Sequence, residues 1–182
     1  MNRGNHYIRL YLGMLLSVLL ASLFFSGLYC FNNKYTQHTT QPISGLLILS
    51  ETDMEQHPSR YLWHDWAYYP NVLLTPADFQ DGSPDRYMTY VNLQSGNRMD
   101  LSGQSDQARF GCGTYLLRIQ VPNTHISYSL DMPEVFSAYR LYINGNPALS
   151  IGNPDPNHYQ DATGSRLITF FPDENGRITI LI

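Results

Sequence analysis

The strongest constraint on this chain is an uncharged segment near its N-terminus, LYLGMLLSVLLASLFFSGLYCF, at residues 10–31. The segment is about 22 residues long, and a helix of that length crosses a hydrocarbon core of about 30 Å. Inside a bilayer the backbone must satisfy its own hydrogen bonds, which for a single segment requires an α-helix. Residues 10–31 are therefore predicted to form a transmembrane anchor.

Charged residues on either side of this segment predict its orientation. Arg3 and Arg9 precede it, and of the basic residues only Lys34 follows it closely. Positive charge favours the cytoplasmic side, so residues 1–9 are expected in the cytoplasm and the folded part outside the cell membrane. A cleaved secretory signal is the alternative, although no Ala-x-Ala-like site follows the apolar run. Under either interpretation the chain beyond the segment is exported.

The exported part begins with a polar linker and carries a net negative charge. Residues 32–42 (NNKYTQHTTQP) show no periodicity and end in proline, which is typical of a linker. All fifteen acidic residues and nine of the eleven basic residues lie beyond residue 31, which gives a formal charge of 9 − 15 = −6. An acidic surface repels phosphate backbones, so nucleic acid is not expected as a partner.

Residues 43–182 are dominated by strand signals. Apolar residues alternate along residues 114–121, 126–132 and 137–143, which gives each segment one buried face. Asn144-Gly145 supplies the positive φ angles of a tight hairpin turn, and Asn175-Gly176 is predicted to do the same. Further β-prone runs lie at residues 45–50, 63–69, 86–93, 167–171 and 177–182. Many short strands with turns at this spacing predict an all-β, antiparallel jelly-roll sandwich.

Helical periodicity is weak beyond the anchor. The one candidate is TPADF at residues 75–79, with Thr75 as the cap and Pro76 at the first helical position. The last β-prone run reaches Ile182, where the sequence stops in mid-strand. Because a strand that stops there would leave its edge pairing incomplete, we expect the domain to continue in a longer protein.

No catalytic constellation stands out in the exported part. Four residues with ligand-type side chains lack metal-ligand spacing: His57, His64, Asp65 and His158. Structural or surface roles are expected for them, and neither a metal nor another cofactor is predicted. No nucleophile elbow occurs, and no local motif selects a carboxylate pair for glycoside hydrolysis. Gly111-Cys112-Gly113 precedes a strand without a following lysine, which predicts a turn or bulge. We therefore expect no enzyme activity within this chain.

Aromatic side chains give the best indication of a binding site. Sugars present apolar C–H faces that stack on Trp and Tyr, while Asp, Asn and Arg bind their hydroxyls. The long polar loop at residues 152–164 is a candidate rim, because binding residues favour loops at the ends of a sandwich. The predicted ligand-binding residues are Trp63, Tyr69, Asp155, His158, Tyr159 and Asp161.

Three segments of the exported part have the character of motifs: LWHDWAYYPNVLLTPADF at residues 62–79, GCGTYLLRIQVP at residues 111–122, and EVFSAYRLYINGN at residues 134–146. They resemble, in order, G-x-W-x-F-Y-x-x-x-L-L-x-P-x-D-F, G-x-G-T-Y-R-L-x-I-x-V-P and I-x-S-A-Y-x-L-Y-V-N-G. These patterns are typical of the extracytoplasmic sensor domain of bacterial seven-transmembrane receptors with diverse intracellular signalling modules. The chain departs from them at Leu116 and Leu117, where a basic residue often stands, with Arg118 close by.

The resemblance implies a galactose-binding-like jelly roll over residues 43–182, distantly similar to the sugar-binding domain of β-galactosidase-type glycoside hydrolases. It implies that Trp66 and Tyr68 belong to the core, and that a histidine kinase (two-component) or nucleotide cyclase output lies beyond this chain. We therefore expect an extracytoplasmic sensor domain that binds a carbohydrate or other small molecule. The alternatives are a non-catalytic carbohydrate-binding module of a membrane-anchored glycoside hydrolase-like protein, and a structural or homodimerisation domain.

Overall fold

The computed structural model describes residues 3–31, 39–93 and 111–182. Contacts divide the chain into two compact units. One comprises Met1–Thr39 with Ser59–Tyr61, and the other comprises Thr40–Pro58 with Leu62–Ile182. Most of the predicted linker lies outside the described residues.

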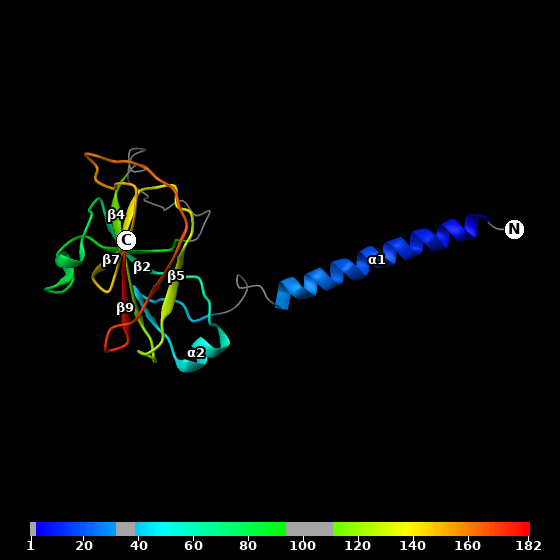
Figure 1. Cartoon of the computed structure of the whole chain (residues 1–182), viewed down its shortest axis with the longest axis horizontal. Helices are drawn as coiled ribbons and strands as arrows, with labels where there is room; N and C mark the ends of the chain where they lie inside the picture. Colours follow the sequence, from blue (N-terminus) through cyan, green and yellow to red (C-terminus); the bar gives the residue numbers. More distant parts are fainter. Residues whose placement is uncertain (1–2, 32–38, 94–110) are drawn as a thin grey trace. The chain divides into compact units, whose positions relative to one another are not determined.

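The first unit contains the predicted anchor. Helix α1 (Arg3–Phe31) is continuous (Figure 1), and its segment Tyr7–Phe31 is long and apolar enough to cross a membrane. The Ser17 hydroxyl donates to the Gly13 carbonyl at 2.9 Å, so this polar side chain is satisfied within the helix. The helix therefore supports a membrane anchor, while its orientation stays a prediction.

The second unit is a mostly antiparallel β structure. The strands are β1 (Leu46–Ile48), β2 (Trp66–Pro70), β3 (Thr89–Val91), β4 (Gly113–Gln120), β5 (Tyr128–Met132), β6 (Tyr139–Ile143), β7 (Asn146–Ile151), β8 (Arg166–Phe170) and β9 (Arg177–Leu181). Seven of them form a large sheet in the order β3-β2-β4-β9-β6-β7, with β1 pairing in parallel to β4. β5 and β8 form a small sheet. The mostly antiparallel β prediction is confirmed, and the jelly-roll topology stays a prediction.

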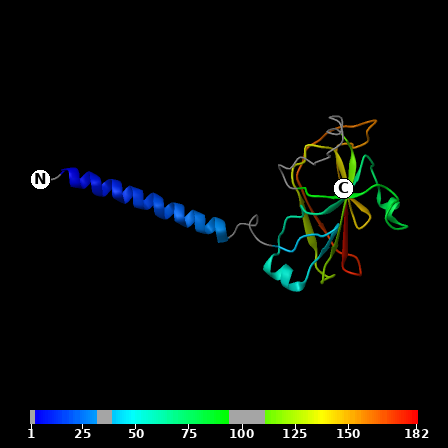
Figure 2. The ribbon, with the colours of Figure 1, turned by 180° about the vertical axis from the view of Figure 1, so that it is seen from behind.

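One face of the large sheet packs on the main core, which we call the inner face. Leu117, Leu141 and Ile180 on this face are at most 1% exposed. Residues of β5 and β8, such as Leu130 and Ile168, pack against them. The apolar residues that alternate along β4 and β6 therefore lie on the face that the second layer buries, as predicted. The two views in Figure 1 and Figure 2 place β5 to one side of the large sheet.

The opposite, outer face is partly covered by the connection between β2 and β3. Tyr69 and Leu116 form a second buried cluster on this face, and Phe79 and Met88 of the connection pack against it. This connection lies on the other side of the large sheet from β5 (Figure 2). β2 is consequently buried on both faces, because Trp66 and Tyr68 point inward while Ala67 and Tyr69 point outward. The predicted burial of Trp66 and Tyr68 is confirmed, at 3% and 7% exposure.

The two Asn-Gly turns differ. Asn144 and Gly145 have φ angles of 51° and 81°, as predicted for a tight hairpin turn between β6 and β7. At the second turn only Gly176 has a positive φ, at 73°, so the prediction for Asn175 is wrong. The physical reason is that this turn does not join two paired strands, since β8 pairs with β5 and β9 pairs with β4 and β6.

The described residues of the second unit also include two short helices. The 3-10 helix η1 (Pro76–Phe79) follows Thr75 and confirms the predicted helical turn. Helix α2 (Glu51–Gln56) was not predicted, because six residues are too short for a periodic pattern. Its capping box was visible in the sequence: the Asp53 backbone N–H donates to the Ser50 hydroxyl at 3.1 Å, and Asp53 accepts from the Ser50 backbone at 3.1 Å.

Candidate functional site

The structure does not bring the predicted ligand-binding residues together. Trp63 precedes β2, and its ring lies edge-on to His64 with centroids 6.0 Å apart. The loop at residues 152–164 follows β7, at the edge of the large sheet. β4, β9 and β6 lie between β2 and β7. At about 4.8 Å per strand, β2 and β7 are about 19 Å apart, so Trp63 and the loop do not form one site.

Tyr69 is a core residue rather than a ligand-binding residue. Its side chain is 2% exposed, and its ring meets Phe79 edge-on with centroids 5.7 Å apart. Because the β2–β3 connection covers this ring, a ligand has no access to it. Tyr69 is therefore not part of the candidate site, and the prediction for this residue is wrong.

Asp155 and His158 lie side by side in the loop at residues 152–164. The Asp155 carboxylate accepts from the Asn157 backbone N–H at 2.9 Å and lies 3.4 Å from His158 Nδ1. The Asn157 bond and then the His158 contact lower the pKa of Asp155 below its ordinary value. These contacts are local to one loop, so they account for its shape without a ligand.

The remaining loop candidates lie at the surface. The Tyr159 hydroxyl accepts from the Ala138 backbone N–H at 3.4 Å, while the side chain is 54% exposed. Asp161 is exposed. Neither residue lines the hollow described next.

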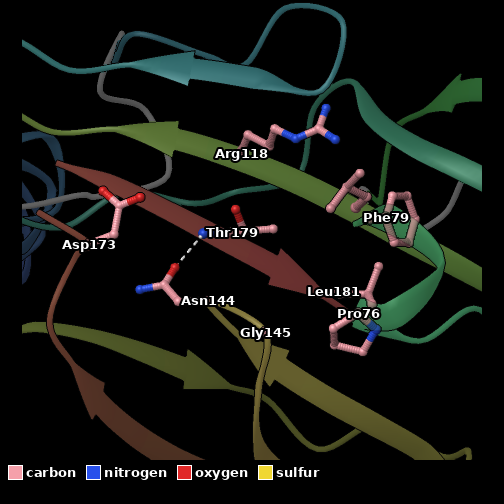
Figure 3. Close-up of a pocket in the computed structure, with 9 residues that line it drawn as sticks. Pro76, Phe79, Arg118, Asn144, Gly145, Asp173, Thr179 and Leu181 are labelled. Carbon is pink, nitrogen blue, oxygen red and sulfur yellow. Dashed lines mark hydrogen bonds between the residues drawn. The ribbon is translucent and has the colours of Figure 1, made fainter. Parts of the chain in front are cut away.

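A hollow of about 250 Å³ on the outer face of the large sheet forms the alternative site (Figure 3). Its walls come from β4, β9, the β6–β7 turn, the β8–β9 turn and η1. The lining residues are Pro76, Phe79, Leu116, Arg118, Asn144, Gly145, Asp173, Thr179 and Leu181.

Strand register places the floor of the hollow. Arg118 is paired with Thr179, and Leu116 is paired with Leu181, across β4 and β9. Paired residues in adjacent strands point to the same face, so all four side chains lie on the outer face. The floor is therefore apolar at the η1 end, and the paired residues Arg118 and Thr179 lie farther along the strands.

The turn residue Asn144 is fixed in place by its own amide. Its Oδ1 atom accepts from the Thr179 backbone N–H at 2.8 Å, the bond drawn in Figure 3. Its Nδ2 atom donates to the Phe171 carbonyl at 3.0 Å. Because both the oxygen and the nitrogen of the side-chain amide are hydrogen-bonded within the protein, Asn144 holds the β6–β7 turn in place as one wall of the hollow.

The wall formed by η1 is tied down by hydrogen bonds. The Asp78 carboxylate accepts from the Thr75 backbone N–H at 2.7 Å and from the Thr75 hydroxyl at 2.8 Å. These bonds lower the pKa of Asp78 below its ordinary value.

The Thr114 hydroxyl, 1% exposed, accepts from the Leu74 N–H and donates to the Val72 carbonyl, both at 2.8 Å. Thr114 therefore joins the connection to β4.

The substitution Thr114→Val is expected to lower the free energy of unfolding by about 2 kcal/mol. Valine keeps the shape but leaves the Leu74 N–H and the Val72 carbonyl without their partner. Chemical denaturation followed by fluorescence checks this, since both tryptophans of the chain, Trp63 and Trp66, lie in the β unit. The exposed Thr163→Val is the control and is expected to change stability little. Equal effects of the two substitutions would contradict the role given to Thr114.

Arg118 and Asp173 provide opposite charges in the hollow. Within the described ranges, no side chain or carbonyl bonds to the Arg118 guanidinium, whereas Arg140 and Arg166 bond to Asn153 and Ser165. One oxygen of Asp173 accepts from the backbone N–H groups of Asn175 and Arg177, at 2.9 and 2.7 Å. Its other oxygen has no donor among the described residues. Both groups are exposed, so a ligand can reach them.

Comparison with protein-family models, curated proteins and solved structures gives no match for this chain. In the part of the chain that the structure describes, no group of three or more His, Cys, Asp or Glu side chains is placed to hold a metal ion. The hollow presents one guanidinium, one carboxylate oxygen and one hydroxyl beside an apolar wall.

Proposed function

We propose that this chain is the extracytoplasmic ligand-binding part of a membrane signalling receptor, with a galactose-binding-like jelly roll as its sensor domain. The observation that carries the proposal is the hollow, where Arg118, Asp173 and Thr179 lie beside the apolar Phe79. The lining combines apolar and polar side chains, and a small number of polar groups placed beside apolar surface is typical of small-molecule sites. The apolar helix α1 supplies a means of holding such a domain at a membrane.

The segments that resemble bacterial sensor domains support the proposal, because all three contribute to the hollow. Pro76 and Phe79 come from the first segment, Leu116 and Arg118 from the second, and the β6–β7 turn from the third. The rest of the lining comes from the β8–β9 turn and β9. Segments that are distant in the sequence thus meet at one surface.

A ligand in this hollow would contact η1, β4, β9 and the β6–β7 turn at the same time. The η1 connection is joined to β4 through Thr114, and the β6–β7 turn is joined to β9 through Asn144. A ligand that bridges these elements favours one arrangement of them over others. Such differential binding is what a receptor needs in order to pass a signal to another part of the molecule.

Thermal unfolding of the full chain in lipid nanodiscs tests the proposal. Neutral sugars, sugar acids, amino acids and small organic acids are added in turn, and tryptophan fluorescence reports the β unit. At least one compound is expected to raise the unfolding temperature saturably, because a ligand selective for the folded state stabilises it.

Matched variants locate the site. Thr179→Val removes a hydroxyl from the hollow and is expected to weaken binding about three- to ten-fold, the loss of one hydrogen bond. Thr163→Val and Tyr159→Ala, in the loop at residues 152–164, are expected to leave binding unchanged. If only Tyr159→Ala weakens binding, the loop is the site; if no compound binds, the proposed function is wrong.

A further inference from the structure

Arg118 has no counterion on the strands around it. Its partners in register are Leu46 on β1 and Thr179 on β9, and its outer-face neighbours along β4 are Leu116 and Gln120. None of these carries a negative charge. Asp173 lines the same hollow but makes no ion pair with Arg118, and Figure 3 places the two at different ends of the hollow. Nine basic and fifteen acidic residues lie beyond residue 31, so a guanidinium without a counterion among the described residues is unusual in this part of the chain.

The surroundings of Arg118 define the groups that a ligand would meet. Figure 3 shows the guanidinium directed toward the end of the hollow that contains Phe79, Pro76 and Leu181. Thr179 lies beside Arg118 as its partner in register, and Asp173 lies at the other end, where its second oxygen is available as an acceptor among the described groups. A ligand that satisfies the whole hollow therefore carries an anion and an apolar face at one end, with hydroxyl donors at the other.

The size and charge of the hollow restrict the ligand further. Its volume of about 250 Å³ lies below the ~300–1,000 Å³ of drug-sized sites, which favours a molecule the size of one sugar ring. A planar guanidinium pairs in a bidentate manner with a carboxylate. The hollow has one cation and one carboxylate, so a monoanion fits it better than a dianionic phosphate group, which Asp173 would repel more strongly.

We propose that the hollow binds a uronic acid, a pyranose whose carboxylate pairs with the Arg118 guanidinium while its ring lies against Phe79 and Pro76. Ring hydroxyls bond to Asp173 and to the Thr179 hydroxyl. The inference rests on the proposed ligand-binding function and names the ligand class of that site. It gives Arg118 the role of determining specificity for an acid over the corresponding neutral sugar.

Matched sugars provide the test. The full chain in nanodiscs is titrated by calorimetry with D-galacturonate and D-galactose, and separately with D-glucuronate and D-glucose. Each pair differs only in a carboxylate or hydroxymethyl group on the same ring. At least one uronate is expected to bind ten-fold or more tightly than its neutral partner. The difference is expected to shrink as salt rises, because the ion pair is solvent-accessible.

Substitution of the arginine separates a specific pair from general attraction. Arg118→Gln is expected to weaken uronate binding at least ten-fold and to change neutral-sugar binding less than three-fold. Its unfolding temperature is expected to match that of the unsubstituted chain, because the guanidinium makes no bond to the described residues. Arg177→Gln is the matched control: Arg177 is exposed on the same face of β9 but does not line the hollow, and uronate binding should be unchanged.

The outcomes distinguish this inference from the function on which it rests. Equal affinity for acid and neutral sugar, or uronate binding that survives Arg118→Gln, overturns the uronate inference and leaves a ligand-binding domain. Failure of both uronates to bind also overturns it; the proposed function then stands only if another compound of the thermal screen stabilises the chain.

Discussion

The substitution Leu117→Ala is expected to lower the free energy of unfolding of the β unit by about 3 kcal/mol. Leu117 is 0% exposed on β4, where it is paired with Ile180 and packs in the main core. Truncation to alanine removes three carbon atoms and the contacts that they make in the core. The neighbouring strands on both sides of β4 keep the backbone from closing the space, so a cavity remains. For a domain of ordinary stability, about 5–15 kcal/mol, this is a large fraction.

Thermal unfolding followed by tryptophan fluorescence measures the effect, with an expected decrease of about 10 °C. Leu167→Ala is the matched control, because Leu167 on β8 is 69% exposed and its truncation is expected to cost less than about 0.5 kcal/mol. A loss at Leu117 no larger than that at Leu167 would show that the two sheets do not pack as described.

Much of the strand content followed from the sequence because it is encoded locally. The alternating residues of β4, β5 and β6 each have one face in the core, so period-two patterns marked them. The aromatic run around β2 did not alternate, since the β2–β3 connection buries its outer face as well. No local pattern predicts the path of this connection. The sequence therefore does not show that the Tyr69 side chain is covered and inaccessible to a ligand.

The hollow was not predictable for a related reason, which is that strand order is non-local. β9 lies between β4 and β6, so Thr179 is placed beside Arg118 and Asn144. Their sequence positions do not indicate this. Arg118 was visible in the sequence as a charge next to a departure from the family pattern, but its significance depends on the absence of a counterion around it in the described fold.

The predicted loop site shows the reverse situation. Asp155 and His158 were selected because polar residues in a long loop are typical of binding sites. In the structure their polar groups contact each other and the backbone of the same loop. Polar composition alone does not distinguish a loop that binds a ligand from one that stabilises itself, because the same residue types serve both purposes.

The substitution Gly113→Ala is expected to cost about 2–3 kcal/mol, although the exchange adds a single methyl group. Gly113 is the first residue of β4 and is paired with Pro70, so it does not form the predicted turn or bulge. A Cβ atom there would collide with the Tyr68 ring, at 2.7 Å from Cζ and 2.6 Å from the hydroxyl oxygen. The glycine is required for space, since its φ is not in the left-handed region.

The Tyr68 ring has little freedom to move away from such a methyl group. It is 7% exposed and stacks on Tyr115 with centroids 4.7 Å apart. Burial raises the pKa of both phenols, that of Tyr115 to about 12, as expected for rings removed from water.

Gly164→Ala is the control, because its Cβ would meet Ile151 at an ordinary 3.6 Å. In a Tyr68→Leu background the cost of Gly113→Ala is expected to fall by more than half, since the clash is pairwise. Additive losses in that double-mutant cycle, measured by chemical denaturation, would mean that Gly113 acts through the backbone and not through the space it leaves for Tyr68.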